Sequence, residues 1–199
     1  MKLGIIGDDF TGSSDIANNL KKSGMQVSMY AGIPLSKAKD EQNHSTDAIV
    51  IALKTRTIPI ENAISESLKA LSWLKKCGCQ QFIFKYCSTF DSTKKGNIGP
   101  VTDALMKELK TDFTIACPSF PDAGRTVYNG HMFVNGVPLN ESGMQNHPLT
   151  PMTDHNLVRW FNYQTEGKVG LLDSISIANG LDSVIDKINE LKKIGYQYA

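Results

Sequence analysis

The sequence predicts an α/β protein with a three-layer αβα arrangement: a mostly parallel sheet between helices, with a small inserted antiparallel β-meander. Apolar runs of strand length alternate with amphipathic helical stretches, which is the pattern of parallel sheets. The run AIVIAL at 48–53 is apolar throughout, as expected of a strand buried on both faces. Two Asn-Gly pairs, at 129–130 and 135–136, suit the type I′ turns of a meander over 125–140.

The elements can be assigned in chain order from these patterns. Strands are expected at 3–7, 27–30, 48–53, 82–84, 113–117, 169–172 and 196–199. Helices are expected at 13–23, 60–74, 101–109 and 181–191, and around Leu157, Val158 and Phe161. Gly24 would end the first of these helices. Pro100 would lie in the first turn of the helix at 101–109, and Asp154 would cap the helix around Leu157. Residues 34–46 are polar and are expected to form a loop.

Composition excludes several classes of function. The chain has 199 residues and a net charge of +1, so no global field attracts nucleic acid or an anionic membrane. No apolar run approaches the roughly 18 residues of a membrane span, and two acids interrupt the N-terminal apolar run too early for a signal peptide. The four cysteines lack metal-site spacing, which predicts reduced thiols, no metal site and a cytoplasmic protein.

Polar residues follow most of the expected strands. In an open α/β sheet, ligands bind outside the carboxyl ends of the strands, so these residues are the first candidates for a site. Cations at these exits suit an acidic small molecule, and hydroxyls near helix N-termini add anion-binding capacity. The alternative is that they are solvated loop residues and helix caps. The cations are Lys54, Arg56, Lys85 and Arg125; the carboxylates are Asp8, Asp9 and Asp91; the hydroxyls are Thr11, Ser13, Ser88, Thr89 and Ser92.

The stretch GDDFTG at 7–12 is not the dinucleotide fingerprint G-x-G-x-x-G, because acids there would repel a pyrophosphate. Nor does KKGNIGP at 94–100 fit a P-loop. Adjacent carboxylates after a strand can bind a polyol, hold magnesium or accept a proton, whereas Asp9 or Asp15 can instead cap the helix. His44 is expected to be solvated, and His131 and His147 are either structural or, for His147, part of a binding loop.

Four segments together resemble the four-carbon acid sugar kinase family, and within it the 3-oxo-tetronate kinase branch. They are GDDFTGSSDIA, KYCSTFDSTKKGNIGPVTDALM, CPSFPDAGRTVYNGHMFVNGVPLNESGM and NHPLTPM, which occur in this order over nearly the whole chain.

The resemblance implies a two-domain kinase that transfers phosphate from ATP to the terminal hydroxyl of a four-carbon acid. Residues 1–199 would form its N-terminal sugar-acid-binding domain, while ATP and Mg²⁺ would bind mainly through a glycine-rich C-terminal domain that the chain lacks. We therefore expect the chain to bind the acid but not to turn over ATP by itself. Asp9 is the first choice for the catalytic base and Asp91 the second. Substrate contacts are expected from Asp8, Thr11, Lys54, Arg56, Lys85, Ser88, Thr89, Ser92, Asn97, Arg125 and His147.

In the same reading, Gly96 and Gly99 allow close approach of the backbone to the ligand. Other functions remain open: a threonate or erythronate kinase of the same family, or a sugar-acid-binding protein without transferase activity. An oxidoreductase on a nucleotide-binding fold is a third alternative, and the missing glycine fingerprint counts against it. A homo-oligomer is also compatible with the sequence.

Overall fold

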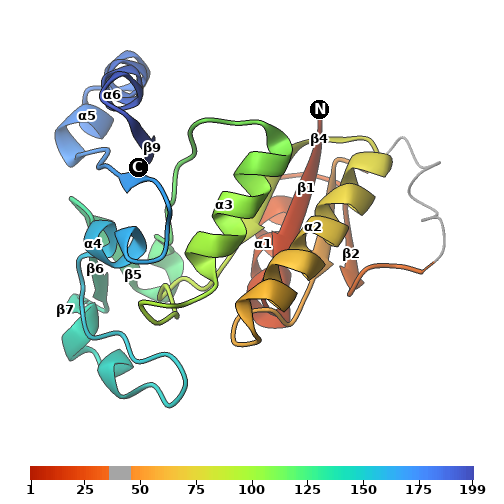
Figure 1. Ribbon diagram of the computed structural model, residues 1–199, viewed down its shortest axis with the longest axis horizontal. Helices are drawn as coiled ribbons and strands as arrows, with labels where there is room; N and C mark the ends of the chain where they lie inside the picture. The colour runs from red at the N-terminus through yellow and green to blue at the C-terminus, as the bar shows by residue number, and fades with distance from the viewer. Residues whose placement is uncertain (36–45) are drawn as a thin grey trace. The chain divides into compact units, whose positions relative to one another are not determined.

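The computed structural model describes residues 1–35 and 46–199, which form two compact units, 1–87 and 88–199. Most of the expected loop at 34–46, including His44, lies outside the described residues. Each unit is described by itself below (Figure 1).

Unit 1–87 contains a four-stranded, fully parallel sheet in the order β2-β3-β1-β4. Its central strand β3 is buried along its whole length, as its continuous apolar sequence predicts. The elements are β1 (Lys2–Gly7), α1 (Phe10–Lys22), β2 (Val27–Ala31), β3 (Ala48–Ala52), α2 (Ile60–Lys76) and β4 (Cys79–Lys85).

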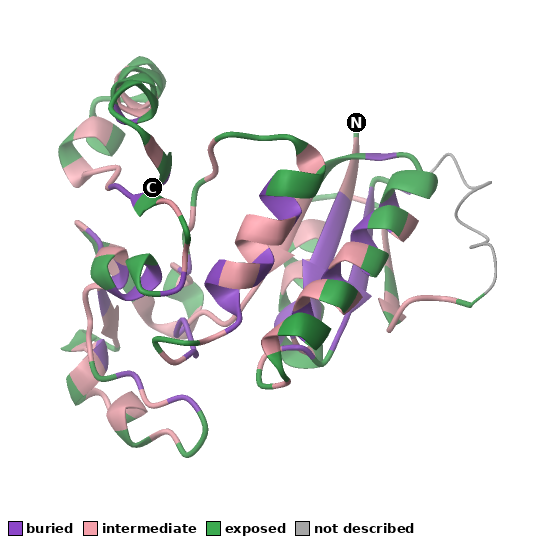
Figure 2. Cartoon of the chain, viewed as in Figure 1, coloured by how far each residue is buried: buried purple, intermediate pink, exposed green. Residues whose placement is uncertain are grey.

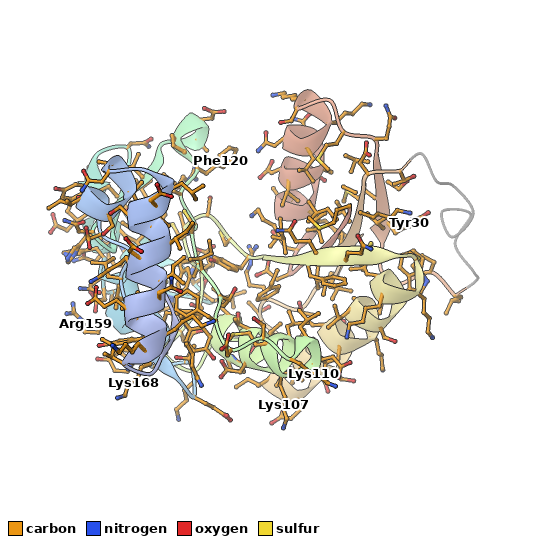
Figure 3. All side chains as sticks on the ribbon, turned by 90° about the horizontal axis from the view of Figure 1, so that it is seen from above. Tyr30, Lys107, Lys110, Phe120, Arg159 and Lys168 are labelled. Atoms are coloured by element: carbon orange, nitrogen blue, oxygen red, sulfur yellow. The ribbon has the colours of Figure 1, made fainter. Side chains whose placement is uncertain are left out.

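Helices cover both faces of this sheet, with α1 and α2 on opposite sides (Figure 3). The apolar stripe of α1 packs against Ile5 and Val50 through Ile16 and Leu20. The predicted three-layer arrangement is therefore confirmed for this unit. The chain leaves β1 toward α1 on one face and leaves the neighbouring β3 toward α2 on the other. This reversal is a topological switch point, where open α/β sheets place ligands.

Unit 88–199 contains the predicted meander and several short elements. Asn129 and Asn135 have φ angles of +47° and +51° and each precedes a glycine with positive φ, as the Asn-Gly turns require. The three strands pair antiparallel in the order β5-β6-β7. The elements are α3 (Ile98–Leu109), β5 (Arg125–Tyr128), β6 (His131–Val134), β7 (Val137–Pro138), α4 (Leu157–Asn162), β8 (Lys168–Val169), α5 (Ser174–Ala178), α6 (Leu181–Lys193), β9 (Tyr196–Tyr198) and the 3₁₀ turns Pro121–Ala123, Leu139–Glu141 and Met144–Asn146.

The sequence-based prediction placed too many strands in the mostly parallel sheet. Strands β8 and β9 form a separate parallel pair, and 113–117 is not a regular strand but runs beside β9. Backbone N–H groups of Thr114 and Ala116 donate to Gln197 and Ala199, at 3.1 and 2.8 Å. The residues that follow 117 are consequently not at an exit of the four-stranded sheet.

Two predictions for the helices of unit 88–199 also need correction. Helix α4 is capped by Asn156, whose side chain accepts from the Arg159 N–H, and not by Asp154. Helix α6 forms where predicted, but its apolar stripe is not core in the described structure. Leu191 is buried, whereas Leu181 is 72% exposed. Most of α6 is coloured as exposed in Figure 2.

None of the four cysteines, all of which lie in the described residues, takes part in a disulfide. Burial raises the pKa of the Cys79 thiol to about 11, so this thiol stays protonated at neutral pH. Among the described residues, no helix combines the length and the apolar character that crossing a membrane requires.

Candidate functional site

Three strands of unit 1–87 end at the same level. Gly7, the last residue of β1, lies opposite Ala52 of β3 and Lys85 of β4. The residues that follow these strands therefore meet at one edge of the sheet, beside the switch point between β1 and β3. This convergence was predicted, and the structure confirms it for Asp8, Asp9, Lys54, Arg56 and Lys85. We call Asp8, Asp9, Arg56 and Lys85 the strand-exit cluster.

Asp8 and Arg56 form a bidentate ion pair at the centre of this cluster. Arg56 Nε donates to Asp8 Oδ2 at 3.1 Å and Arg56 Nη2 donates to Asp8 Oδ1 at 2.8 Å. The backbone holds Asp8 in place, since its N–H donates to Lys85 O and its carbonyl accepts from Thr55 N–H. Only 4% of the Asp8 side chain is exposed, so its charge is compensated inside the protein rather than by water.

Burial dominates the titration of this pair. Loss of solvation raises the pKa of Asp8, although the hydrogen bond and charge of Arg56 act in the opposite direction. For Arg56, burial acts to lower the pKa, but the hydrogen bond and charge of Asp8 and the charge of Asp9 outweigh it, and the pKa is raised. Arg56 is therefore always positively charged, and the carboxylates of Asp8 and Asp9 compensate its charge.

Asp9 binds the same guanidinium and caps α1. Its Oδ1 lies 2.9 Å from Arg56 Nη2 and accepts the Gly12 N–H at 2.9 Å. The capping alternative considered for Asp9 is thus correct, which does not by itself remove it from catalysis. No hydrogen bond or ion pair in the described part of the chain engages its Oδ2. Its side chain is 28% exposed, so it is the carboxylate of the pair that solvent and ligands reach more easily.

Lys85 brings its ammonium group to the first turn of α1. Its Nζ donates to the Tyr86 carbonyl at 2.6 Å. A Cβ placed on Gly12 would lie 3.1 Å from Lys85 Nζ and 2.8 Å from Asp9 Oδ1, so the absent side chain of Gly12 makes room for both groups. Within residues 1–35 and 46–199, Lys85 takes part in no ion pair with a carboxylate. Of the two cations at the centre of the edge, Lys85 is the one available to an anion.

Two further predicted residues lie at the margin of this edge. Lys54 follows β3 but is exposed, and its Nζ lies 5.0 Å from the centre of the Phe10 ring. Thr11 is exposed in the first turn of α1, where backbone N–H groups have no intrahelical acceptor. Ser13 is structural, because its buried hydroxyl donates to Asp9 O and packs against Gly7.

Unit 88–199 begins with the segment 88–97, which contains most of the other predicted residues. Thr89 Oγ1 donates to Asp91 Oδ1 at 2.5 Å, and Ser92 Oγ donates to the Phe90 carbonyl at 2.9 Å. Phe90 has a left-handed φ of +55°, which is rare for an aromatic residue. Thr89, Asp91, Ser92 and Asn97 are all buried, and Ser88 is half-buried. The segment is thus a compact loop held by its own side chains.

Gly96 and Gly99 pack closely against other residues of the protein and leave no open space there for a ligand. A Cβ on Gly96 would collide with Ser92 Cβ at 2.6 Å, and one on Gly99 would collide with Gln164 Cβ at 2.4 Å. The Gly99 N–H already donates to Gln164 Oε1 at 3.0 Å. This corrects the expected role of the glycines. It also identifies Gln164, which sequence reasoning missed because no local pattern connects it to a loop 65 or more residues earlier.

Arg125 is not at an exit of the four-stranded sheet, since 113–117 is not one of its strands. It begins β5, and its guanidinium donates to the nearby carbonyl of Ala123. Its buried Nε has no hydrogen-bond partner in the described structure, so a role for Arg125 stays a prediction.

His147 lies in the irregular stretch after the meander, as predicted. Its Nδ1 lies 3.0 Å from the Thr150 backbone nitrogen, whose N–H must donate, so the neutral ring carries its proton on Nε2. His131 stacks on His155 with ring centres 4.9 Å apart, which favours the structural interpretation of His131.

The described residues do not fit a nucleotide or metal site. At the N-terminus of α1, the carboxylates of Asp8 and Asp9 would repel a polyphosphate. The Gly12 N–H already donates to Asp9 Oδ1. At the N-terminus of α3, the Gly99 N–H already donates to Gln164 Oε1. In the part of the chain that the structure describes, no three His, Cys, Asp or Glu side chains gather as metal ligands would. Binding of ATP and Mg²⁺ by this chain therefore has no support from its geometry.

Comparison with known proteins gives one consistent relationship. A family model described as the sugar-binding N-terminal domain matches residues 3–199. A 3-oxo-tetronate kinase of Pseudomonas savastanoi pv. phaseolicola is 55% identical over 99% of this chain, which covers 46% of that protein. The chain thus spans about half the length of the curated relatives it matches.

Solved structures agree with this relationship. A Salmonella typhimurium LT2 protein described as a putative tRNA synthase has a TM-score of 0.95 and 48% identity, over 100% of this chain and 47% of that one. A Bordetella bronchiseptica protein, a domain-swapped dimer with bound citrate, has a TM-score of 0.67 and 26% identity, over 81% of this chain and 40% of that one. The chain belongs to the family of sugar-binding N-terminal domains, and its curated relatives are 3-oxo-tetronate kinases.

Proposed function

We propose that this chain is the sugar-acid-binding half of an ATP-dependent kinase that phosphorylates the terminal hydroxyl of 3-oxo-tetronate. Relatives more than 50% identical over 99% or more of the chain support the reaction, and they are about twice as long as this chain. The strand-exit cluster of unit 1–87 is the proposed acid site. ATP and Mg²⁺ would bind through the additional residues that such relatives have.

The observation that carries the proposal is the availability of Lys85. Arg56 is committed to two carboxylates, whereas the Lys85 ammonium group stands at the open first turn of α1. A substrate carboxylate there would meet the ammonium ion and the free N–H groups of the helix, both of which favour an anion. The Bordetella relative, of which this chain covers 40%, was solved with bound citrate, which is itself a carboxylic acid.

Asp9 is the proposed base for the attacking hydroxyl. Lys85 Nζ and Asp9 Oδ1 both lie close to the point where a Cβ of Gly12 would stand, at 3.1 and 2.8 Å. An acid whose carboxylate meets Lys85 can therefore bring a hydroxyl of the same molecule to Asp9. Phosphoryl transfer depends mainly on such positioning and on stabilisation of charge.

Asp91 is the second candidate for the base. Its buried carboxylate already accepts the Thr89 hydroxyl. In a longer enzyme of this family, Asp9→Asn should lower kcat by roughly 100- to 10,000-fold with a small effect on KM. Asparagine also caps helices, so the fold should survive. A correctly folded Asp9→Asn enzyme with near-normal kcat would exclude Asp9 and favour Asp91.

Several finer points belong to the same proposal. Cysteines outside disulfides and the kinase relatives favour a cytoplasmic location. The swapped dimer of the Bordetella relative makes a homo-oligomer worth testing by light scattering. The tRNA synthase description of the Salmonella protein does not transfer to this chain, because a net charge of +1 does not favour RNA binding.

Calorimetry of the 199-residue chain tests the proposal. The chain should bind 3-oxo-tetronate, and it should not bind erythritol, which has the four carbons and hydroxyls but no carboxylate. Threonate and erythronate in the same panel test the alternative substrates. Binding of threonate or erythronate in preference would reassign the branch, and absence of binding to all three acids would refute the acid site. Turnover of ATP by a longer family enzyme, but not by this chain, separates a kinase from a sugar-acid-binding protein.

A further inference from the structure

Gln164 is a buried polar residue outside every predicted site. It lies two residues after α4, and only 7% of it is exposed. Its own N–H donates to the Phe161 carbonyl at 2.9 Å, which fixes the backbone from which the side chain extends. A buried carboxamide needs partners at both its oxygen and its nitrogen, so the partners it finds show what it holds.

The carboxamide connects the middle of the 88–97 loop to the helix that follows it. Its Nε2 donates to Ser92 Oγ and to the Thr93 carbonyl, both at 2.8 Å. Its Oε1 accepts the Gly99 N–H at 3.0 Å in the first turn of α3. These partners lie 65 to 72 residues earlier in the chain. One side chain therefore ties the Ser92–Thr93 backbone to the start of the helix that follows the loop.

Close packing makes this connection specific. Gly99 cannot carry a side chain, because a Cβ there would lie 2.4 Å from Gln164 Cβ. The Ser92 hydroxyl donates to the Phe90 carbonyl while it accepts from Gln164, so its orientation is fixed from both sides. Phe90, with its left-handed backbone, is packed edge-to-face against Phe161 at 5.6 Å. A strained residue persists only where its surroundings determine its conformation, and α4 with Gln164 supplies those surroundings.

We propose that Gln164 is a positioning residue, which holds the 88–97 loop in the conformation that binds the sugar acid. The inference rests on the proposed function, in which Asp91 of this loop is the second candidate for the base; Thr89 donates to the Asp91 carboxylate and holds it. Gln164 acts through Ser92, Thr93 and Gly99 and does not touch the substrate. Ser92, predicted from the sequence to contact the substrate, is by this account an internal link between Gln164 and Phe90.

Calorimetry with 3-oxo-tetronate on the 199-residue chain tests this role with two variants. Gln164→Met keeps the length of the side chain but removes three hydrogen bonds, so the acid should bind roughly 10- to 100-fold more weakly. Gln164→Glu keeps the shape but cannot donate while ionised. A protonated glutamic acid donates again, so its binding should recover as pH falls from 8 to 5, relative to Gln164→Met at each pH. The control Gln80→Glu changes the same atoms at an exposed position.

Hydrogen exchange of the Gly99 amide and fluorescence of the buried Trp160 show whether each variant keeps its fold. Support requires weaker acid binding and faster Gly99 exchange in Gln164→Met, with Trp160 fluorescence unchanged. Normal acid binding by Gln164→Met overturns the proposal, as does a Gln164→Glu variant whose binding does not recover at low pH. If the wild-type chain binds no four-carbon acid, the proposed function fails and the positioning role fails with it. Failure of the positioning role alone is distinguishable, because the wild-type chain then still binds the acid.

Discussion

Two arginine–aspartate pairs with nearly the same geometry lie in different surroundings. In unit 1–87, Arg56 Nε and Nη2 donate to the Asp8 carboxylate at 3.1 and 2.8 Å. In unit 88–199, Arg159 Nε and Nη2 donate to the Asp154 carboxylate at 2.6 and 2.8 Å. The exposed fraction separates them: Arg56 is 20% exposed, whereas Arg159 is 55% exposed and lies at the surface (Figure 3).

The difference shows that burial, not bidentate geometry, decides what such a pair does. Burial raises the pKa of Asp8 against the effect of Arg56, while the hydrogen bond from Arg159 lowers the pKa of Asp154. Water can replace Arg159 as a partner of Asp154, but it cannot replace Arg56. Arg56 is therefore held within the fold, which supports our proposal that Lys85 binds the anion at the strand-exit cluster.

The largest expected effect is on stability. Arg56→Leu leaves the Asp8 carboxylate buried without its partner, which should lower the free energy of unfolding by about 3–5 kcal/mol at pH 7. Arg159→Leu, the matched control, should have a much smaller effect, because Arg159 is 55% exposed and Asp154, at 18% exposed against 4% for Asp8, can still be reached by water. Urea unfolding measures both. Trp73 in α2 reports on unit 1–87 and Trp160 in α4 reports on unit 88–199.

Backgrounds that carry Trp160→Phe or Trp73→Phe separate the two signals. Equal losses of stability for Arg56→Leu and Arg159→Leu would show that burial is not what distinguishes the pairs.

The next effect is a pH dependence of opposite sign to that of an ordinary salt bridge. Without Arg56, the folded-state pKa of Asp8 rises further above its unfolded value, so between those two values the folded state binds more protons. The free energy of unfolding then falls as pH rises through this window, by up to about 1.4 kcal/mol per pH unit. The deficit of Arg56→Leu should therefore be largest at pH 7–8 and should shrink toward pH 5.

Unfolding curves of wild type and Arg56→Leu across this pH range check the sign. The lowered pKa of Asp154 predicts the reverse for Arg159: its contribution is present above about pH 3.8 and is lost only as pH falls through the lowered value. Arg159→Leu should thus show a deficit that is constant from pH 5 to 8. A deficit of Arg56→Leu that grows toward pH 5 would contradict the assignment.

The smallest expected effect is on salt dependence. Mobile ions screen charges in contact with solvent, with a Debye length of about 10 Å at 0.1 M and 3 Å at 1 M, but they reach buried charges poorly. The difference between wild type and Arg159→Leu should therefore vanish when NaCl is raised from 0.05 to 1 M. The difference between wild type and Arg56→Leu should remain. Loss of both differences in 1 M NaCl would mean that Asp8 and Arg56 are more accessible to solvent than the structure shows.

The sequence predicts the strand-exit cluster because its signals are local. A continuous apolar run marks each strand of the four-stranded sheet, and parallel strands bring their carboxyl ends to one edge, so Asp8, Arg56 and Lys85 could be grouped in advance. Their pairing could not, because Arg56 reaches Asp8 and Asp9 only through the register of β1 and β3. Arg56, predicted from the sequence to contact the substrate, forms ion pairs with Asp8 and Asp9, and its substrate contact stays a prediction.

Long-range packing explains the other differences. Gln164 is linked to the 88–97 loop across more than 60 residues, and no spacing rule signals such a contact. The expected strand at 113–117 had the right composition, but within the described residues it runs beside β9, so Arg125 does not follow a strand of the four-stranded sheet. The apolar stripe of α6 correctly predicted a helix, since periodicity specifies an amphipathic face and not what covers it.

Binding of 3-oxo-tetronate by the Lys85→Met chain tests the central claim most directly. Loss of one charge-assisted hydrogen bond is worth about 1.5–3 kcal/mol, so calorimetry should show affinity reduced roughly 10- to 150-fold. Lys76→Met, at the exposed C-terminal end of α2, removes the same charge away from the strand exits and should bind normally. If Lys85→Met binds the acid as tightly as wild type and Lys76→Met do, then Lys85 is not the anion-binding cation and the account of the strand-exit cluster is wrong.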